Sequence, residues 1–179
     1  LNDWQAVGNI DEVKTGKRRN TCLLGQDIIV EMDHGRARMF EANAEGGMGE
    51  EHPAQIMYGH IWTTLGTPEK PPIDMPEFLE DGRRLVACGA ITVRASALRI
   101  VENFLDMSHF PYVHTGVLGE EPYTEVAAYK SEIRQPDNEL WATDCNFFQP
   151  QAAMSADDGQ MSEYMSRVSS PFVTVSYKT

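Results

Sequence analysis

The sequence predicts an α+β protein in two parts, an N-terminal β domain and a C-terminal antiparallel sheet packed with one long helix. Three observations carry this prediction. Short β-rich runs separated by turn residues fill residues 1–66, four prolines within residues 67–78 favour an extended surface linker, and a helical pattern followed by four strand-like runs fills residues 79–179.

The first part contains one clear hairpin. The run TCLLGQDIIVEMDHGRARMFEA has β-rich halves on both sides of Asp33-His34-Gly35, and QIMYGHIWTTLG is typical of a further strand. Between them, residues 43–53 are rich in glycine and glutamate and are expected to form a loop.

In the second part, residues 84–95 resemble a strand, and Ser96 is a suitable N-cap for a helix that runs to Phe110, where Pro111 interrupts it. The apolar positions of this helix cover more than a single stripe, so we expect it to be largely buried. The four strand-like runs after it are residues 125–134, 139–150, 161–168 and 172–179.

Composition narrows the classes of partner. The chain has 179 residues, a formal net charge of -12 and a sequence pI near 4.7, so it repels phosphate backbones and anionic lipid, and we expect no nucleic-acid or membrane partner. Cys22, Cys88 and Cys145 stand alone, without metal-binding or disulfide spacing. With no signal-peptide pattern at the start, a cytoplasmic protein is expected. The chain opens on Leu1 and stops on a strand-like run, so we expect it to be a piece of a longer protein.

Residues 102–116, ENFLDMSHFPYVHTG, carry the strongest chemical signal. On a helix Asp106 and His109 share a face, whereas His114 joins them only where the helix bends or ends, as Pro111 allows. Two neutral imidazoles beside a carboxylate are typical of non-haem Fe(II) sites, which leave open positions for dioxygen and substrate. The spacing also fits a structural interpretation, in which Asp106 and His109 form a buried hydrogen-bonded pair and His114 ends the helix.

The pattern Asn103-x-x-Asp106-x-x-His109-x4-His114 resembles the mononuclear-iron motif of Rieske-type ring-hydroxylating oxygenases, the group that includes vanillate O-demethylase oxygenase. The likeness covers most of the chain in the family's order. The parts similar to the family's Rieske domain are Trp4 to Gly8, Gly16, Leu23-Leu24-Gly25, Asp33-His34-Gly35, Tyr58-Gly59-x-Ile61-Trp62 and Leu65-Gly66.

This resemblance implies a Rieske-like β domain over residues 1–66 and a catalytic domain of helix-grip (START-like) fold over residues 79–179. It makes His109 and His114 ligands of Fe(II). It makes Asp106 a catalytic residue that orients a ligand histidine and lies on the electron route from the Rieske cluster of a neighbouring subunit.

The implied activity is that of an oxygenase. It would use Fe(II) and dioxygen to hydroxylate or oxidatively demethylate a small apolar or aromatic substrate, with electrons from NAD(P)H through a reductase or ferredoxin and a 2Fe-2S Rieske centre. The subunit-to-subunit route implies a homo-oligomer, by family likeness a trimer. The rival hypothesis is a non-catalytic module of the same fold that binds a hydrophobic ligand and lacks the cluster.

Six further residues are candidates for the substrate pocket, because aromatic and aliphatic side chains commonly line such pockets. Plain core packing is an equal alternative for the apolar members, and a local helix hydrogen bond for the asparagine. They are Asn103, Met107, Phe110, Val117, Leu118 and Phe147.

The chain departs from the family pattern at the cluster. The Cys-x-His and Cys-x-x-His pairs that hold a Rieske cluster are missing from the sequence, and His52 is expected to be a solvated loop residue. Either the cluster segment was lost in evolution or the chain joins separated pieces. We favour the second and expect a break between residues 43 and 58. The family's third iron ligand is acidic, and the local candidates Asp144, Asp157 and Asp158 give no basis for assigning it.

Overall fold

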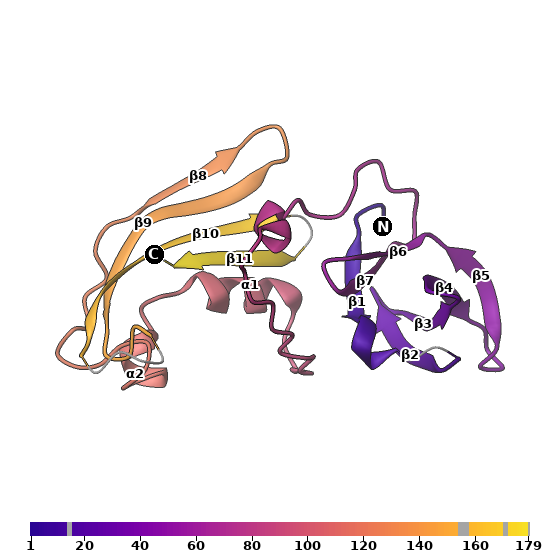
Figure 1. Cartoon of the computed structure of the whole chain (residues 1–179), viewed down its shortest axis with the longest axis horizontal. Helices are drawn as coiled ribbons and strands as arrows, with labels where there is room; N and C mark the ends of the chain where they lie inside the picture. Colours follow the sequence, from indigo (N-terminus) through magenta and orange to yellow (C-terminus); the bar gives the residue numbers. More distant parts are fainter. Residues whose placement is uncertain (14–15, 154–157, 170–171, 179) are drawn as a thin grey trace. The chain divides into compact units, whose positions relative to one another are not determined.

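The computed structural model describes residues 1–13, 16–153, 158–169 and 172–178, and the chain divides into two compact units, residues 1–93 and 94–179. Both units consist mainly of antiparallel strands with few helices, as Figure 1 shows. Each unit has its own sheet system.

The first unit contains a three-stranded sheet in the order β1-β7-β6 and a four-stranded sheet in the order β2-β3-β4-β5. The predicted hairpin is confirmed as β3 and β4, joined through His34 and Gly35, which both have positive φ. The elements are β1 (Gln5–Asn9), η1 (Ile10–Glu12), β2 (Arg18–Leu23), β3 (Gln26–Asp33), β4 (Arg36–Ala42), β5 (Met48–His52), β6 (Ala54–Met57), β7 (His60–Thr63) and η2 (Pro76–Leu79).

The core of this unit lies on the strands whose apolar residues alternate. Ile28 and Val30 on β3, Met39 on β4 and Ile61 on β7 are at most 1% exposed and belong to one cluster. Their two-residue spacing along β3 places both side chains on the same face of the sheet. Burial of this face is the main stabilising contribution in the unit.

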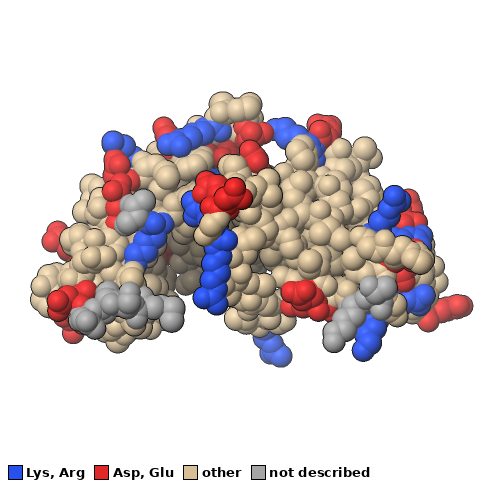
Figure 2. Space-filling view, viewed as in Figure 1, with Lys and Arg blue, Asp and Glu red and all other residues tan. Residues whose placement is uncertain are grey.

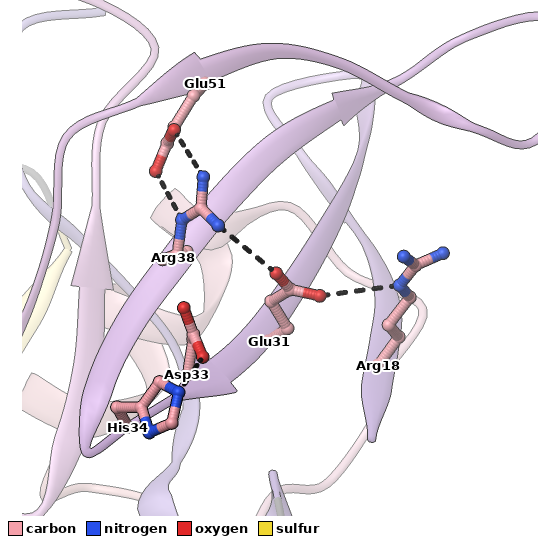
Figure 3. A network of polar contacts seen from close by, with 6 residues as sticks. All are labelled: Arg18, Glu31, Asp33, His34, Arg38 and Glu51. Carbon is pink, nitrogen blue, oxygen red and sulfur yellow. Dashed lines mark hydrogen bonds and ion pairs between the residues drawn. The ribbon is translucent and has the colours of Figure 1, made fainter. Parts of the chain in front are cut away.

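The expected break between residues 43 and 58 is wrong. The Asn43 side chain accepts a hydrogen bond from the backbone N–H of Gly47 at 2.7 Å, and the turn leads into β5, which pairs with β4. Figure 3 shows the ion pairs on this sheet: Arg38 binds Glu51 on β5 at 2.8 Å and approaches Glu31 on β3 at 3.8 Å. Residues 43–58 therefore form a turn followed by strands β5 and β6, which pair with β4 and β7.

The expectation for His52 is also wrong. It was expected in a solvated loop, but its side chain is only 11% exposed and its Nε2 lies 3.0 Å from the Glu41 carboxylate. The reason is the same strand, because β5 places His52 opposite Met39 in the register.

The predicted linker, residues 67–78, belongs to the first compact unit, and the boundary lies later, after residue 93. The Trp4 indole donates to the carbonyl of Lys70 at 2.7 Å, and Met75 N donates to the Tyr58 hydroxyl at 3.0 Å. The Tyr58 ring also packs on Phe78, with ring centroids 5.1 Å apart. These contacts hold the proline-rich segment against the first unit.

The second unit has one antiparallel sheet in the order β11-β10-β9-β8 and two short helices. Figure 1 shows α1 running along one face of this sheet, with α2 beyond its end. The elements are α1 (Ala97–Leu105), α2 (Phe110–Val113), β8 (Lys130–Arg134), β9 (Glu139–Gln149), β10 (Gln160–Ser169) and β11 (Val173–Lys178).

Three predictions about this region need correction. Residues 84–95 form no strand. Among the described residues no neighbouring strand pairs with them, and a strand is stable only when its backbone bonds to a partner. The helix ends at Leu105, not at Phe110, and Pro111 instead opens the second helix α2. Helix α1 contains no buried residue, and Asn103, Phe104 and Leu105 near its end line a cavity.

On the face shown in Figure 2, acidic and basic side chains are interspersed and do not gather into a basic stripe. Among the described residues, no helix is both long and apolar enough to span a bilayer.

Candidate active site at the junction of helices α1 and α2

The site is built where α1 ends. Ser96 caps the start of α1, as predicted, by accepting a hydrogen bond from the Arg99 backbone N–H at 3.4 Å. At the other end Asp106 leaves the helical conformation, with φ −78° and ψ 116°. Its side chain then binds the backbone two residues later, a local bond that competes with continued helix. After this turn, His109 and His114 lie close together and line the same cavity.

Asp106 divides its carboxylate between two partners. Oδ1 accepts from the Ser108 backbone N–H at 2.8 Å and from the Ser108 hydroxyl at 2.5 Å. Oδ2 lies 3.1 Å from His109 Nδ1, which donates to it. The Ser108 hydroxyl is the main cause that holds the pKa of Asp106 below its ordinary value, against the opposing effect of burial. Asp106 is therefore a charged partner that fixes one ring nitrogen of His109 as the donor.

The two histidines lie together, as the spacing predicted. Their ring centroids are 5.2 Å apart and the ring planes meet at 62°. The Phe110 ring packs edge-on against both, at 4.9 Å from His109 and 6.0 Å from His114. Since Asp106 occupies Nδ1 of His109, Nε2 is the nitrogen left to bind a metal.

Both histidines line one cavity of about 290 Å³ between α1 and the sheet. Five of the six candidate pocket residues line it, namely Asn103, Met107, Phe110, Leu118 and Phe147, whereas Val117 is exposed and lies outside the lining. Sequence reasoning missed Phe104 and Leu105 on α1 and, apart from Phe147, the residues of the sheet wall, which are Ala142, Cys145, Tyr164, Ser166 and Ser176.

The sheet wall is held by stacked aromatic rings. Phe147 packs edge-on against Phe110 at 5.1 Å and stacks on Tyr164 at 4.9 Å. Behind the wall, the Tyr164 hydroxyl accepts from the fully buried Gln149 amide at 2.9 Å, and Lys178 donates to the same amide at 2.5 Å. The ring of Tyr164 therefore faces the cavity while its polar end is bound elsewhere.

Cys145 contributes a buried thiol to the same wall. Burial is the main cause that raises the pKa of this thiol, and the nearby Asp144 carboxylate adds to it. The neutral thiol donates weakly to the Thr143 carbonyl at 3.8 Å. It therefore acts as a small apolar residue of the cavity wall.

The donor set fits a metal in part. Two imidazoles on one cavity wall suit Fe(II), but among the described residues no three His, Cys, Asp or Glu side chains gather around one point. Asp144 is paired with Lys130 at 2.8 Å and Asp158 is exposed. Asp157 lies outside the described residues. The structure therefore supplies two ligand candidates for iron here.

A 2Fe-2S cluster does not fit the described chain. Cys22 on β2, Cys145 on β9 and Cys88 in a segment without helix or strand are free thiols, and none has a histidine beside it in the sequence. Where a cluster loop would leave the sheet, the Asn43–Gly47 turn and the Tyr58–Gly59 turn close the strands directly.

Comparison with known proteins supports a relation to one enzyme family. Residues 93–172 match the family model of the vanillate O-demethylase oxygenase C-terminal domain. Over all of its 179 residues the chain is 38% identical to the probable methylxanthine N7-demethylase NdmC of Pseudomonas sp. (strain TJI-51). It spans 62% of the length of that relative.

Solved structures show the same fold at low identity. The terminal oxygenase of carbazole 1,9a-dioxygenase from Nocardioides aromaticivorans IC177 matches with a TM-score of 0.64 and 14% identity, over 97% of this chain and 66% of that one. A carbazole 1,9a-dioxygenase oxygenase in complex with ferredoxin matches with a TM-score of 0.59 and 13% identity, over 99% of this chain and 70% of that one. Residues 93–172 are thus similar to the C-terminal domain of vanillate O-demethylase oxygenase, the whole chain is similar to a probable N-demethylase, and its fold is similar to that of a terminal oxygenase.

Proposed function

We propose that this chain carries the oxygen-activating site of a Rieske-type oxygenase that hydroxylates or oxidatively demethylates a small aromatic substrate. The observation that carries the proposal is the pair His109 and His114 on one wall of the cavity, with Asp106 bound to the first ring. Fe(II) held there by the two imidazoles would supply dioxygen activation when bound.

The chain's own residues have distinct tasks in this proposal. Asp106 keeps the His109 ring in one orientation and keeps its Nδ1 protonated, which leaves Nε2 for the metal. Phe110, Phe147 and Tyr164 form an aromatic wall that holds a flat ring by stacking. Met107 and Leu118 complete an apolar lining that keeps water away from the reacting carbon.

Electrons would come from NAD(P)H through a reductase or ferredoxin and a Rieske centre. The described residues do not fit a cluster, so the centre would lie outside them. In one related structure the oxygenase is in complex with a ferredoxin, which supports a partner of this kind. We further propose a homo-oligomer, by family likeness a trimer, in which Asp106 lies on the electron route between subunits.

The relative that is 38% identical suggests the first substrate to test, an N-methylated purine. In oxidative demethylation, the methyl carbon gains one oxygen atom of dioxygen, and the other atom leaves as water with two electrons and two protons. The resulting N–CH2OH group releases formaldehyde and leaves the ring N–H. The products to follow are therefore formaldehyde and the demethylated ring.

The experiment supplies iron-loaded protein with NADH, a reductase, a Rieske-type electron donor and 7-methylxanthine, and measures formaldehyde against oxygen consumed. The proposal expects equal amounts of both, with loss of both in His109→Ala. Protein that takes up no iron when Fe(II) is supplied, yet binds the purine and yields no formaldehyde with any donor, would support the rival hypothesis, a binding module. That rival is favoured by one observation, the lack of cluster ligands in this chain.

A further inference from the structure

The cavity has two chemically different ends. At one end lie His109, His114 and Phe110, and Phe147 joins them from strand β9. At the other end two hydroxyls, Ser166 on β10 and Ser176 on β11, face each other with their oxygens 2.9 Å apart. The register explains the separation, because Ser162 stands opposite Phe147 whereas Ser166 stands opposite Ala142. At about 3.3 Å per residue, the two ends lie roughly 15 Å apart along β9.

A bulge in β9 builds this arrangement. The pairing of β9 with β10 shifts register between Tyr164 and Ser166, and Asp144 has a positive φ of 62° there. One extra residue on β9 resets the alternation of side chains, so Cys145 and Ala142 both face the cavity. On β10, which has no extra residue, the ordinary two-residue alternation places Tyr164 and Ser166 on the same, cavity-facing side.

The hydroxyl pair presents one donor and several acceptor positions. Each serine has one hydroxyl hydrogen, and one of the two is used in the bond between them. The other hydrogen is available to a carbonyl oxygen, and the oxygen lone pairs are available to an N–H. Ser166 is half-buried and Ser176 is exposed, so an incoming ligand can reach both.

We infer that Ser166 and Ser176 form a polar anchor that selects planar heteroaromatic substrates carrying an adjacent carbonyl and N–H on one edge. The inference rests on the proposed function, since it takes the histidine end as the reacting end. A ligand bound in this way would present its opposite edge, with the group to be oxidised, to His109 and His114. An apolar ring of the same size would leave the serine pair without a partner and gain nothing from it.

The test measures dissociation constants for two probes of similar size, 7-methylxanthine and 1-methylnaphthalene, by calorimetry on the iron-loaded protein. Ser166→Ala and Ser176→Ala should each weaken binding of 7-methylxanthine by about 3- to 10-fold, and the double variant by about 10- to 100-fold. Binding of 1-methylnaphthalene should stay within about 2-fold in every variant, because it makes no bond to the hydroxyls.

Ser162→Ala is the matched control. Ser162 lies on the same strand, is 1% exposed, and its hydroxyl has no hydrogen-bond partner among the described residues and lies outside the cavity lining. The control should leave both dissociation constants unchanged. If the double variant does not fold, the two single variants, each checked by thermal unfolding, carry the test.

Two results would overturn the inference: wild-type protein that binds the naphthalene at least as tightly as the xanthine, or serine variants that bind both probes like wild type. Metal analysis of the same samples distinguishes a failure of the serine anchor from a failure of the proposed function. Serine-dependent selectivity in protein that takes up no iron would keep the anchor and contradict the oxygenase. Normal iron and turnover with unchanged serine variants would contradict the anchor alone.

Discussion

At the scale of single residues, the divided carboxylate of Asp106 is the feature on which the site depends. One oxygen is held by Ser108 and the other is left for His109, so the carboxylate cannot turn away from the ring. Its charge is kept by the same contacts, which lower its pKa. A metal-binding histidine oriented in this way is a stronger ligand than a free one.

Replacing Asp106 by asparagine should separate metal binding from turnover. Asp106→Asn keeps both histidines, so we expect most of the bound iron to remain, within about 10-fold in affinity. Turnover with NADH, reductase and Rieske donor should be nearly abolished, because the charged partner of His109 is lost. Iron content and formaldehyde release measure the two effects.

Asp33→Asn, in the β3–β4 turn of the other compact unit, is the control and should turn over like wild type. Wild-type turnover in Asp106→Asn would exclude a role in electron transfer and leave Asp106 as a structural residue.

At the scale of elements, the second helix α2 is fixed by a close approach of the chain at Gly119. A Cβ at that position would lie 2.8 Å from Pro111 N and 3.1 Å from the carbonyl carbon of Phe110. Both are backbone atoms of the short helix that separates His109 from His114, so the helix would have to move.

Gly119→Ala should therefore loosen the metal site without touching a ligand. We expect iron affinity to fall by about 10-fold and unfolding free energy to fall by about 1–3 kcal/mol, the usual cost of overpacking. Gly47→Ala is the control, since its Cβ would meet only the Asn43 side chain, outside the site. Equal iron affinity in both variants would show that α2 does not position the histidines.

The ion pair between Arg38 and Glu51 on strand β5 predicts how stability depends on pH. The Arg38 guanidinium binds Glu51 and holds the pKa of that carboxyl below its ordinary value. Glu51 therefore stabilises the fold above its unfolded pKa, about 4.3, and this contribution is lost as pH falls through the lower folded pKa.

Glu51→Gln should make the acid dependence of stability shallower below about pH 4.3, measured by denaturant unfolding across that range. Glu50→Gln, a neighbouring exposed residue on the same strand, should keep the wild-type slope. The same steep slope in Glu51→Gln as in wild type would mean that the ion pair shown in Figure 3 does not hold β5.

The proximity of Asp106, His109 and His114 could be predicted because they lie within nine residues of sequence and Pro111 indicates a break in the helix between the two histidines. Apart from Phe147, the sheet wall of the cavity could not be predicted from the sequence. Tyr164, Ser166 and Ser176 reach the cavity through strand register and a bulge at Asp144, and these depend on tertiary pairing. A local signal did exist for Ser108, whose position two residues after Asp106 is typical of an aspartate turn.

At the scale of the whole molecule, the hairpin of β3 and β4 was predictable because its turn residues and alternation are local. The role of residues 43–58 was not, because family likeness favoured a missing segment where the chain itself forms β5 and β6. The structure of residues 84–95 was not predictable either, because their composition is strand-like but no strand among the described residues pairs with them.

The two compact units should respond to mutation separately. Met39 is fully buried in the first unit, and Met39→Ala should lower its unfolding free energy by about 2–5 kcal/mol through a core cavity. As a control, Met161→Ala replaces an exposed methionine of the second unit and should change the unfolding free energy by less than about 0.5 kcal/mol. Binding of 7-methylxanthine at temperatures where Met39→Ala is folded should match wild type, and a parallel loss would show that the cavity depends on the first unit.

Iron analysis of purified protein tests the central claim most directly. The account predicts about one iron per chain in wild type and in His34→Ala, whose side chain is 95% exposed in a hairpin turn. It predicts loss of more than about 90% of that iron in His109→Ala and in His114→Ala, because each removes one of two protein ligands. Iron retained at the wild-type level in both variants would contradict the account.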